Sequence, residues 1–264
     1  MIRTLPGDGD EYLQGEIMMR FTAARLSALL LFFSLLGGCV SAPPHQSYNR
    51  AEHQITNIVV LPMRRSEPQV SIMNHPGQNF GLIGLLVTEA DLASKSERLR
   101  GHLIRARFDQ GLILREALGH ALQQRGYTVA WPDHLIDSYP KTPRDWTGGR
   151  KTYGPLSNGQ AQLDVNYSFI GYAAAGATKD APYRPTVTMS VRLMSVDGRS
   201  TLFSDRFTYN NLGAANSMRD SVTIEADPRF SYPRFDDLEA ADAQLAEGLR
   251  VAIEAIAGKI AERL

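Results

Sequence analysis

The fold is decided by residues 186–209, which read Thr-Val-Thr-Met-Ser-Val-Arg-Leu-Met-Ser-Val-Asp-Gly-Arg-Ser-Thr-Leu-Phe-Ser-Asp-Arg-Phe-Thr-Tyr. Apolar and polar side chains alternate through the first half, which is typical of a half-buried β-strand. Asp197-Gly198 favours a tight hairpin turn, so residues 201–209 are expected to return as a second strand. The alternating positions are Val187, Met189, Val191 and Leu193 against Thr186, Thr188, Ser190 and Arg192.

The same alternation occurs upstream and predicts a third antiparallel strand. Its members are Leu163, Val165, Tyr167 and Phe169 against Asp164, Asn166 and Ser168. Residues 55–63 form a β-branched apolar run closed by Pro62, which indicates a buried strand, and residues 127–131 indicate a short one. The segment between them at 64–79 is interpreted as loop. We therefore expect about five strands.

Helices are expected between and after these strands. Residues 109–124 place Leu112, Leu118, Ala121 and Leu122 on one face, with Asp109 as the N-cap and Gly126 as the left-handed stop. An apolar segment, residues 80–87, precedes a polar helical stretch that ends near residue 107. It is either a surface for lipid or close helix packing, or the first turns of a helix buried on its own domain; we favour the second interpretation.

The last element has the clearest periodicity. Asp236 and Glu239 resemble a capping box at its start, and its apolar side chains repeat at steps of three, four and seven residues: Leu238, Leu245, Leu249, Ile253, Ile256 and Ile260. This predicts a long amphipathic C-terminal helix laid on a sheet. The fold class is therefore α/β, an α+β sandwich with a mixed sheet and helices packed on it, in a single domain over residues 55–264.

Composition limits the function without choosing it. The chain has 264 residues, 43% of them hydrophobic, with 28 basic and 28 acidic side chains. This zero net charge gives no electrostatic reason to expect nucleic acid as a partner. A chain of this length buries a core without disulfides or metals, and a single cysteine, Cys39, excludes an internal disulfide.

The neighbourhood of Cys39 indicates export. Residues 26–38 are uncharged and mostly apolar and follow Arg20 and Arg25, which is the layout of a secretory signal, and the run is too short to span a bilayer. Leu36-Gly37-Gly38-Cys39 resembles the lipobox of bacterial lipoproteins. The resemblance implies cleavage between Gly38 and Cys39 and acyl chains on Cys39. Residues 1–38 are then a lipoprotein signal peptide, and the acidic residues in 1–17 suggest that the true start is Met18 or Met19.

The residue after the lipobox cysteine also implies a cellular location. Val40, in place of Asp, resembles the default sorting pattern to the outer membrane, where the lipid anchor at Cys39 would hold the protein on the periplasmic face. Residues 39–54 lack apolar periodicity and are interpreted as a lipidated flexible tether. Without residues 1–38 the chain keeps 25 basic and 24 acidic groups (28 − 3 and 28 − 4), so it stays near neutral.

The order of elements resembles three groups of periplasmic domains: the curli-export lipoprotein, the lipoprotein activators of penicillin-binding proteins and the amino-terminal domain of the Tol-Pal β-propeller protein. The resemblance is carried by Ile58-Val-Val-Leu-Pro62, Leu122-Gln-Gln-Arg-Gly126-Tyr-Thr-Val129, Phe169-Ile-Gly171 and Asp197-Gly198. It implies a domain that binds another periplasmic protein.

Motifs for chemistry are absent from the sequence. It contains no nucleophile elbow, phosphate-binding loop or His-Glu-x-x-His, and its histidines lack metal-ligand spacing, so we expect no catalytic residue, cofactor or metal. The loop at residues 138–160 is the one candidate surface, because aromatic and basic side chains suit a glycan, an anionic polymer or a protein partner. The candidates there are Arg144, Trp146, Arg150 and Tyr153; the alternative is a solvated loop with one Trp folded on the core.

Three functions follow in order of preference. The first is a non-enzymatic, membrane-anchored envelope lipoprotein that binds a periplasmic protein partner of unknown identity. The second is an accessory or assembly subunit of an envelope transport or secretion system. The third is a cell-wall hydrolase with carboxylates that the sequence does not single out.

Overall fold

The computed structural model describes residues 45–64, 66–74, 81–137, 143–145, 149–210, 212 and 221–264, with the backbone alone at 81–85 and 136–137. All of these residues belong to one compact unit, Ala42–Leu264. The predicted signal segment, with Gly38 and Cys39, lies outside the described residues. The predicted α/β class, with a long C-terminal helix on a mixed sheet, is confirmed.

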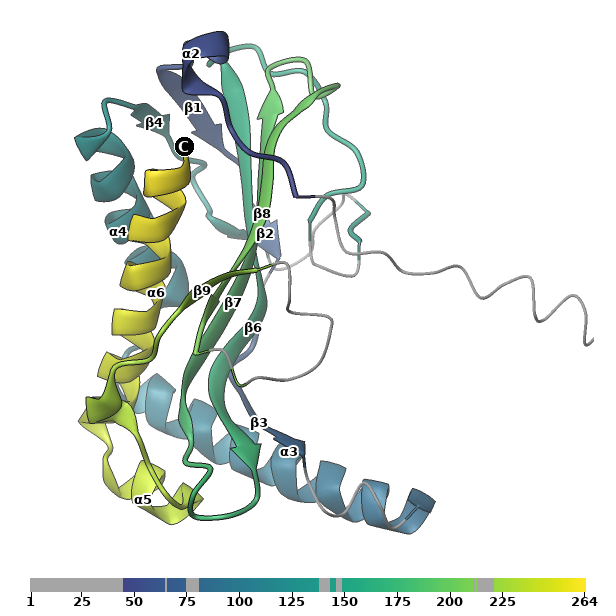
Figure 1. Ribbon diagram of the computed structural model, residues 1–264, viewed down its shortest axis with the longest axis vertical. Helices are drawn as coiled ribbons and strands as arrows, with labels where there is room; N and C mark the ends of the chain where they lie inside the picture. The colour runs from purple at the N-terminus through teal and green to yellow at the C-terminus, as the bar shows by residue number, and fades with distance from the viewer. Residues whose placement is uncertain are drawn as a thin grey trace, which may run out of the picture. The chain divides into compact units, whose positions relative to one another are not determined.

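Seven strands form the central sheet: β1 (Asn57–Val60), β3 (Gln69–Asn74), β4 (Thr128–Ala130), β6 (Ala161–Gly176), β7 (Arg184–Ser195), β8 (Thr201–Tyr209) and β9 (Val222–Ile224). Their order is β4-β1-β6-β7-β8-β9, and β3 also pairs with β6 (Figure 1). β1 is parallel to β4 and β6, whereas β6, β7 and β8 are antiparallel. A separate parallel ribbon joins β2 (Met63–Arg64) to β5 (Ile136–Asp137).

Two strands share one edge of β6. β1 pairs with its beginning, from Ala161 to Leu163, and β3 pairs with its end from Gly171 onward. Gly171 has φ +151°, and a Cβ there would lie 1.8 Å from the carbonyl oxygen of Gln69, so only glycine lets β3 approach. The strand expected around residues 163–169 continues to Gly176. Part of the predicted loop at 64–79 is the strand β3.

The expected alternation holds along β6 until a β-bulge between Tyr167 and Phe169 shifts it. Beyond the bulge, Ile170 pairs with Val187 and Phe169 pairs with Thr188, so Phe169 moves to the polar face and Ile170 replaces it in the core. The polar face is also not open to solvent, as a half-buried strand would be. Its buried members include Asp164, Asn166, Thr188, Ser190, Ser204 and Thr208.

Helices cover the apolar face of the sheet. These are α3 (Gly81–Arg105), α4 (Gln110–Gln124), α5 (Phe235–Ala240) and α6 (Ala243–Arg263), and a short α2 (Arg50–His53) precedes β1. Figure 1 shows α4 and α6 side by side along the sheet. The expected apolar face of α6 is buried throughout, at Leu245, Leu249, Ile253, Ile256 and Ile260. Tyr172 on β6 donates to the carbonyl of Leu245 at 2.9 Å and ties α6 to the sheet.

The C-terminal helix is interrupted, which differs from the single helix expected to start at Asp236. The break falls at Asp242, whose φ of 36° is incompatible with a right-handed helix. α5 turns away because Phe235 packs edge-on against Tyr183, with ring centroids 5.9 Å apart. The cap is also two residues earlier than expected: the Asp237 carboxylate accepts from the backbone N–H of Arg234 at 3.1 Å.

The caps of α4 agree with the sequence, and its buried face agrees at Leu118 and Leu122 but not at Leu112. Asp109 accepts from the backbone N–H groups of Gly111 and Leu112, and Gly126 adopts φ +84° after the helix, as predicted. Leu112, however, is 52% exposed, and the buried face carries Leu114 in its place. Leu114, Leu118 and Leu122 recur every four residues, so the stripe winds slightly around the helix as it crosses the core.

Of the apolar segment 80–87, only the last two side chains are described, and they differ from the favoured interpretation. Leu86 and Val87 are 57% and 65% exposed, whereas Thr88 beside them is buried. The helix is held to the sheet farther along, where Ser96 accepts from the backbone N–H of Val70 on β3 at 2.9 Å. The lipid or helix-packing role of residues 80–87 stays a prediction. No helix among the described residues is both long enough and apolar enough to cross a bilayer.

The expected flexible tether at 39–54 is docked on the domain over its described part. Gln46 forms an antiparallel bridge with Ser204 on the edge of β8. Farther along, Asn49 caps α2 and Arg50 donates to the carbonyl of Arg125 at 2.6 Å. We call residues 46–53 the N-terminal arm. It covers the part of the β8 edge that β9 leaves unpaired, because β9 pairs only from Phe207 onward.

Candidate functional site

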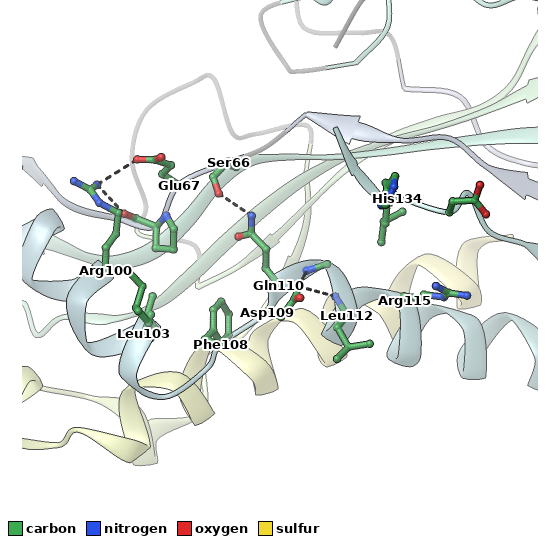
Figure 2. A pocket seen from close by; sticks show the side chains of 15 residues that line it. Ser66, Glu67, Arg100, Leu103, Phe108, Asp109, Gln110, Leu112, Arg115 and His134 are labelled. Carbon is green, nitrogen blue, oxygen red and sulfur yellow. Dashed lines mark hydrogen bonds and ion pairs between the residues drawn. The ribbon is translucent and has the colours of Figure 1, made fainter. Parts of the chain in front are cut away.

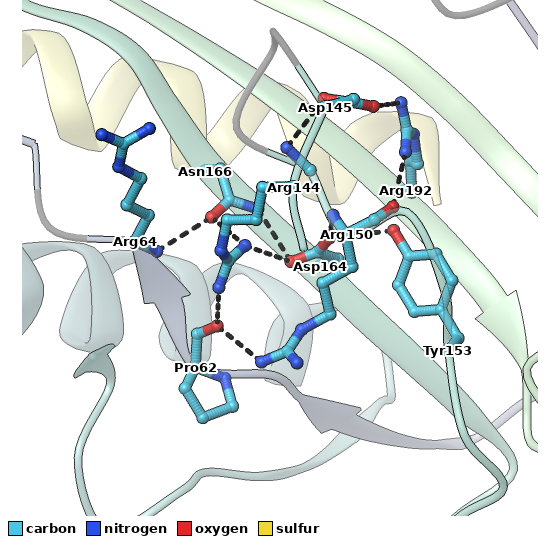
Figure 3. A network of polar contacts seen from close by, with 10 residues as sticks. Pro62, Arg64, Arg144, Asp145, Arg150, Tyr153, Asp164, Asn166 and Arg192 are labelled. Atoms are coloured by element: carbon cyan, nitrogen blue, oxygen red, sulfur yellow. Dashed lines mark hydrogen bonds and ion pairs between the residues drawn. The ribbon is translucent and has the colours of Figure 1, made fainter. Parts of the chain in front are cut away.

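The structure brings three of the four candidate loop residues together. Arg144, Arg150 and Tyr153 converge on the start of β6 (Figure 3). The fourth, Trp146, lies outside the described residues, as do the predicted lipidation and cleavage positions Gly38 and Cys39. Residues 143–145 fold back on 149–151 through an antiparallel bridge between Arg144 and Arg150.

The convergence occurs where the chain leaves the edge of β6 between β1 and β3. In this gap the side chain of Asn166 takes the place of a strand backbone: its Oδ1 accepts from the backbone N–H of Arg64 at 3.1 Å. The same oxygen accepts from Arg144 at 2.9 Å. Arg144 and Arg150 both donate to the carbonyl of Pro62, at 2.9 and 3.0 Å. Two guanidinium groups thus occupy the gap between the two parallel neighbours of β6.

Asp164 is the anionic centre of this network. Its carboxylate accepts from Asn166 at 2.7 Å, from the backbone N–H of Arg150 at 2.9 Å and from the hydroxyl of Tyr153 at 2.9 Å. The Arg144 guanidinium lies 3.8 Å away, and the two side chains are 5% and 0% exposed. Burial, and then the nearby charge of Asp164, raise the pKa of Tyr153 and keep its phenol neutral. These side chains hold the loop on the sheet.

A second layer of contacts ties the loop to the hairpin between β7 and β8. Arg192 forms a 2.5 Å ion pair with Asp145 and donates to the carbonyl of Arg150. Gly198, at φ +72°, lies so close that a Cβ there would be 2.6 Å from the carbonyl oxygen of Tyr153. The predicted Asp197-Gly198 turn is therefore present, and its glycine also permits a close approach to the loop.

The loop, the hairpin and the N-terminal arm enclose a basic pocket of about 470 Å³. Its charged lining residues in the described chain are all cations: Arg150, Lys151, Arg192 and Arg199. Gln46 forms part of the rim from the arm, and its side chain donates to the carbonyl of Thr201 at 2.6 Å. The sequence indicated Arg150 and Tyr153 together, but Arg192 and Arg199 reach the pocket from β7 and from the turn before β8 and carry no local signal.

A larger cleft of about 580 Å³ lies beside the sheet, between the C-terminal end of α3, the start of α4 and the segments that follow β2 and β4 (Figure 2). These segments follow the carboxyl ends of the parallel strands β1 and β4, a common place for binding sites in α/β folds. The sequence did not single this cleft out, because its lining comes from four separate stretches: residues 66–68, 100–104, 108–115 and 133–135.

The rim of this cleft is apolar and exposed. Ile104 is 76% exposed and Leu112 is 52% exposed, and they are two of the four large hydrophobic side chains that stand out among the described residues. Phe108 lies between them in the chain. The floor is fixed by Gln110, which is buried and donates from its side chain to the carbonyl of Ser66 at 2.7 Å.

Charges around the cleft are mixed. Figure 2 shows Arg100 and Glu67, whose charged atoms lie 3.9 Å apart, at one end and Arg115 with His134 at the other. Arg115 also lies over the ring of Trp131, 5.9 Å from its centroid. The balance of signs gives no preference for a strongly charged small molecule. The exposed apolar side chains suit a protein surface better.

The described residues give no positive sign of metal or catalytic chemistry. No group of three or more His, Cys, Asp or Glu side chains there has the arrangement of a metal site. Asp236 and Asp237, adjacent in the sequence, lie in the first turn of α5, where negative charge stabilises a helix start. The predictions that the chain has no cofactor and is not an enzyme stay predictions.

Comparisons with known proteins identify no family for this chain. No family model matches the chain, and no curated protein matches it. One solved structure that it resembles is a DUF330-family protein from Xanthomonas campestris, with 10% sequence identity and a TM-score of 0.34 over 83% of this chain and 85% of the other. A likeness this weak carries no functional argument, and the resemblance to the three groups of periplasmic domains stays a prediction.

Proposed function

We propose that this chain is a membrane-anchored lipoprotein of the bacterial envelope whose α/β domain binds a periplasmic protein partner at the cleft between α3 and α4. Anchoring is supported by Leu36-Gly37-Gly38-Cys39 at the end of an apolar, uncharged run. Three acyl chains on Cys39 would make attachment stable, where a single chain is marginal. Val40 favours the outer membrane as the address.

The observation that carries partner binding is the exposed apolar rim of the cleft. Ile104 and Leu112 belong to different helices, yet both stand at the same opening. Exposed apolar side chains gathered at a depression, with charged side chains around them, are the usual composition of a protein-binding surface. The expected partner inserts an apolar side chain between them and places polar groups near Glu67 and Arg115.

The anchor is tested by mass spectrometry of the amino-terminal peptide from envelopes. The expected result is a peptide that begins at Cys39 and carries acyl chains, and a Cys39→Ala variant that lacks them and leaves the membrane fraction. A wild-type peptide without acyl chains refutes the anchor. A peptide that begins at Cys39 does not report the start of translation, so the amino terminus of the uncleaved precursor is measured in parallel to decide between Met18 and Met19.

The partner is tested by site-specific photocrosslinking in intact envelopes. A crosslinking amino acid at position 112 is expected to give a defined product, and one at Ser94, exposed on another side of α3, is expected to give none. Ile104→Asp should then reduce the product at position 112 by roughly tenfold, because an apolar contact of this size contributes about 1.5 kcal/mol or more. Equal products at both positions, or no effect of Ile104→Asp, contradict the proposal.

An accessory subunit of an envelope transport system is a narrower form of the same proposal, and the identity of the crosslinked protein decides between them. The cell-wall hydrolase has no specific support among the described residues. Zymography on peptidoglycan with the purified chain tests it directly, and a clearing zone would replace the proposal above.

A further inference from the structure

The basic pocket lies where the chain enters the domain from its proposed anchor. Gln46, on the pocket rim, is only seven residues after Cys39 (46 − 39). A fully extended chain of seven residues reaches roughly 25 Å. The arm would have to detach from β8 to lengthen this reach. Detachment breaks the two backbone hydrogen bonds that Gln46 exchanges with Ser204, at 2.8 and 3.0 Å.

The pocket is built before any ligand arrives. Tyr153 is fixed by its hydroxyl on Asp164, and the adjoining backbone is fixed by Gln162, whose side-chain amide donates to the carbonyl of Gly154 at 2.7 Å. Leu156 donates its backbone N–H to the carbonyl of Val196 at 2.9 Å, which holds the loop on the hairpin. Figure 3 shows Tyr153 and the backbone of Arg150 on Asp164, and Arg192 on the carbonyl of Arg150.

The charge of the pocket exceeds what its neighbours neutralise. Three carboxylates lie near these cations: Asp145 pairs with Arg192, Asp197 lies 3.9 Å from Arg199, which is 87% exposed, and Asp164 accepts from the backbone N–H of Arg150. The Arg150 guanidinium donates to the carbonyl of Pro62, and Lys151 and Arg199 are the exposed cations of the pocket. Without residues 1–38 the whole chain has a net charge of about +1, so this concentration of cations is local.

We propose that this pocket, on an otherwise near-neutral chain, binds the phosphate of an anionic lipid headgroup in the membrane that carries the anchor. The inference rests on the anchor of the proposed function. The tether holds the pocket near the headgroups, so the effective concentration of headgroups at the pocket is high. The pocket is then occupied even where its affinity for a headgroup is low. Planar guanidinium groups suit phosphate oxygens, and each basic side chain near an anionic surface strengthens binding roughly fivefold. The consequence is a domain held in one orientation on the membrane.

The test uses the chain from Ala42 to Leu264, which forms one compact unit whose core residues all follow residue 54. It lacks Cys39, so its result is independent of acylation. Flotation is measured with vesicles of phosphatidylcholine that contain about one third phosphatidylglycerol, and with vesicles of phosphatidylcholine alone. We expect binding to the first and much weaker binding to the second. Equal binding to both would overturn the proposal.

The pocket is tested by Lys151→Gln with Arg199→Gln, both at exposed positions outside the buried network. The partition coefficient on the anionic vesicles should fall roughly 25-fold, fivefold for each charge. The matched control is Arg105→Gln with Lys179→Gln, which removes one Arg and one Lys from exposed positions away from the pocket and should change binding less than twofold. Similar losses in the two double variants overturn the pocket as the site.

Inorganic phosphate separates a membrane ligand from a free anion. If the chain binds phosphate in a manner that Lys151→Gln with Arg199→Gln abolishes, yet does not float with anionic vesicles, the lipid source is wrong. Pocket-dependent flotation supports the inference even where mass spectrometry finds Cys39 without acyl chains. That combination refutes the anchor alone, so the two failures are distinguishable.

Discussion

Replacement of Asp164 by alanine is the sharpest test of the network beneath the loop. The change removes the acceptor for Asn166, for the Arg150 backbone and for Tyr153. It also removes the carboxylate that lies 3.8 Å from Arg144, whose side chain is 5% exposed. The guanidinium would then stay buried beside that of Arg150, still bonded to Asn166 and Pro62 but without this counter-charge.

The magnitude follows from burial. Removal of one partner of a buried ion pair costs about 3–5 kcal/mol, since the remaining charge loses its compensation. Exposed pairs are worth about 0–1 kcal/mol. Asp164 is fully buried and its partner nearly so, whereas Glu254 pairs with Arg250 at 2.5 Å with both side chains more than 40% exposed. Asp164→Ala should therefore cost about 3–5 kcal/mol and Glu254→Ala less than about 1 kcal/mol.

Urea unfolding at 25 °C measures both free energies of unfolding on the chain from Ala42 to Leu264. The dependence on urea should be unchanged, so that a shift of the midpoint reports stability. A cost for Asp164→Ala close to that of Glu254→Ala would refute the network as a stabilising element. Addition of Arg144→Met to Asp164→Ala should recover part of the loss, because it removes the uncompensated charge.

Three further predictions concern single contacts. Gly171→Ala should lower the free energy of unfolding by about 3 kcal/mol or more, because alanine rarely adopts this backbone conformation and its Cβ would clash with Gln69. The control Gly154→Ala places its Cβ in open space and should lower it by less than about 0.5 kcal/mol; thermal unfolding measures both. Ser96→Ala removes the acceptor for the backbone N–H of Val70 and should cost about 1–3 kcal/mol, with faster hydrogen exchange at that amide. Burial raises the pKa of Tyr127 from 10 to about 12. The stability that its neutral form contributes is therefore full below pH 10 and is lost between pH 10 and 12. Tyr127→Phe should flatten this part of the profile of stability against pH, measured by urea unfolding.

The sequence predicted the fold class because its strongest signals are local. Alternation identified β6 and β7, and the Asp197-Gly198 turn predicted that the chain returns as β8. The strands that it missed, β3, β5 and β9, have two to six residues. In β3 only Val70 and Ile72 are buried apolar positions, and two such positions are too few for periodicity to separate a strand from a loop.

Leu112 shows why the candidate cleft was not found. Sequence periodicity assigns it to the buried face with Leu118 and Leu122, since apolar residues are expected inside. The structure buries Leu114 and leaves Leu112 half exposed beside Ile104, which belongs to another helix. An apolar residue that function requires on the surface looks the same in the sequence as one that packing requires in the core.

The loop at 138–160 shows that polar and aromatic residues are equally ambiguous in the sequence. Its basic and aromatic composition indicated a binding surface, but composition does not separate a side chain that binds a partner from one that neutralises a buried carboxylate. Arg144 is buried on Asp164, whereas Lys151 is exposed at the pocket. The distinction depends on Asp164, whose polar position in an alternating strand would ordinarily face water.

The arrangement of the two candidate surfaces links the proposals. Ala161, at the start of β6, pairs with Ser195 beside the hairpin of the basic pocket, and Tyr167 on the same strand donates to the backbone of Gln110 in the cleft. Six residues of strand separate these positions, which is roughly 20 Å. The pocket and the N-terminal arm lie toward the amino end of β1, and the cleft lies beyond its carboxyl end. An anchor at Cys39 and a headgroup in the pocket would therefore hold the same end of the domain at the membrane, and the cleft with Ile104 and Leu112 would face the periplasm, where a protein partner can reach it.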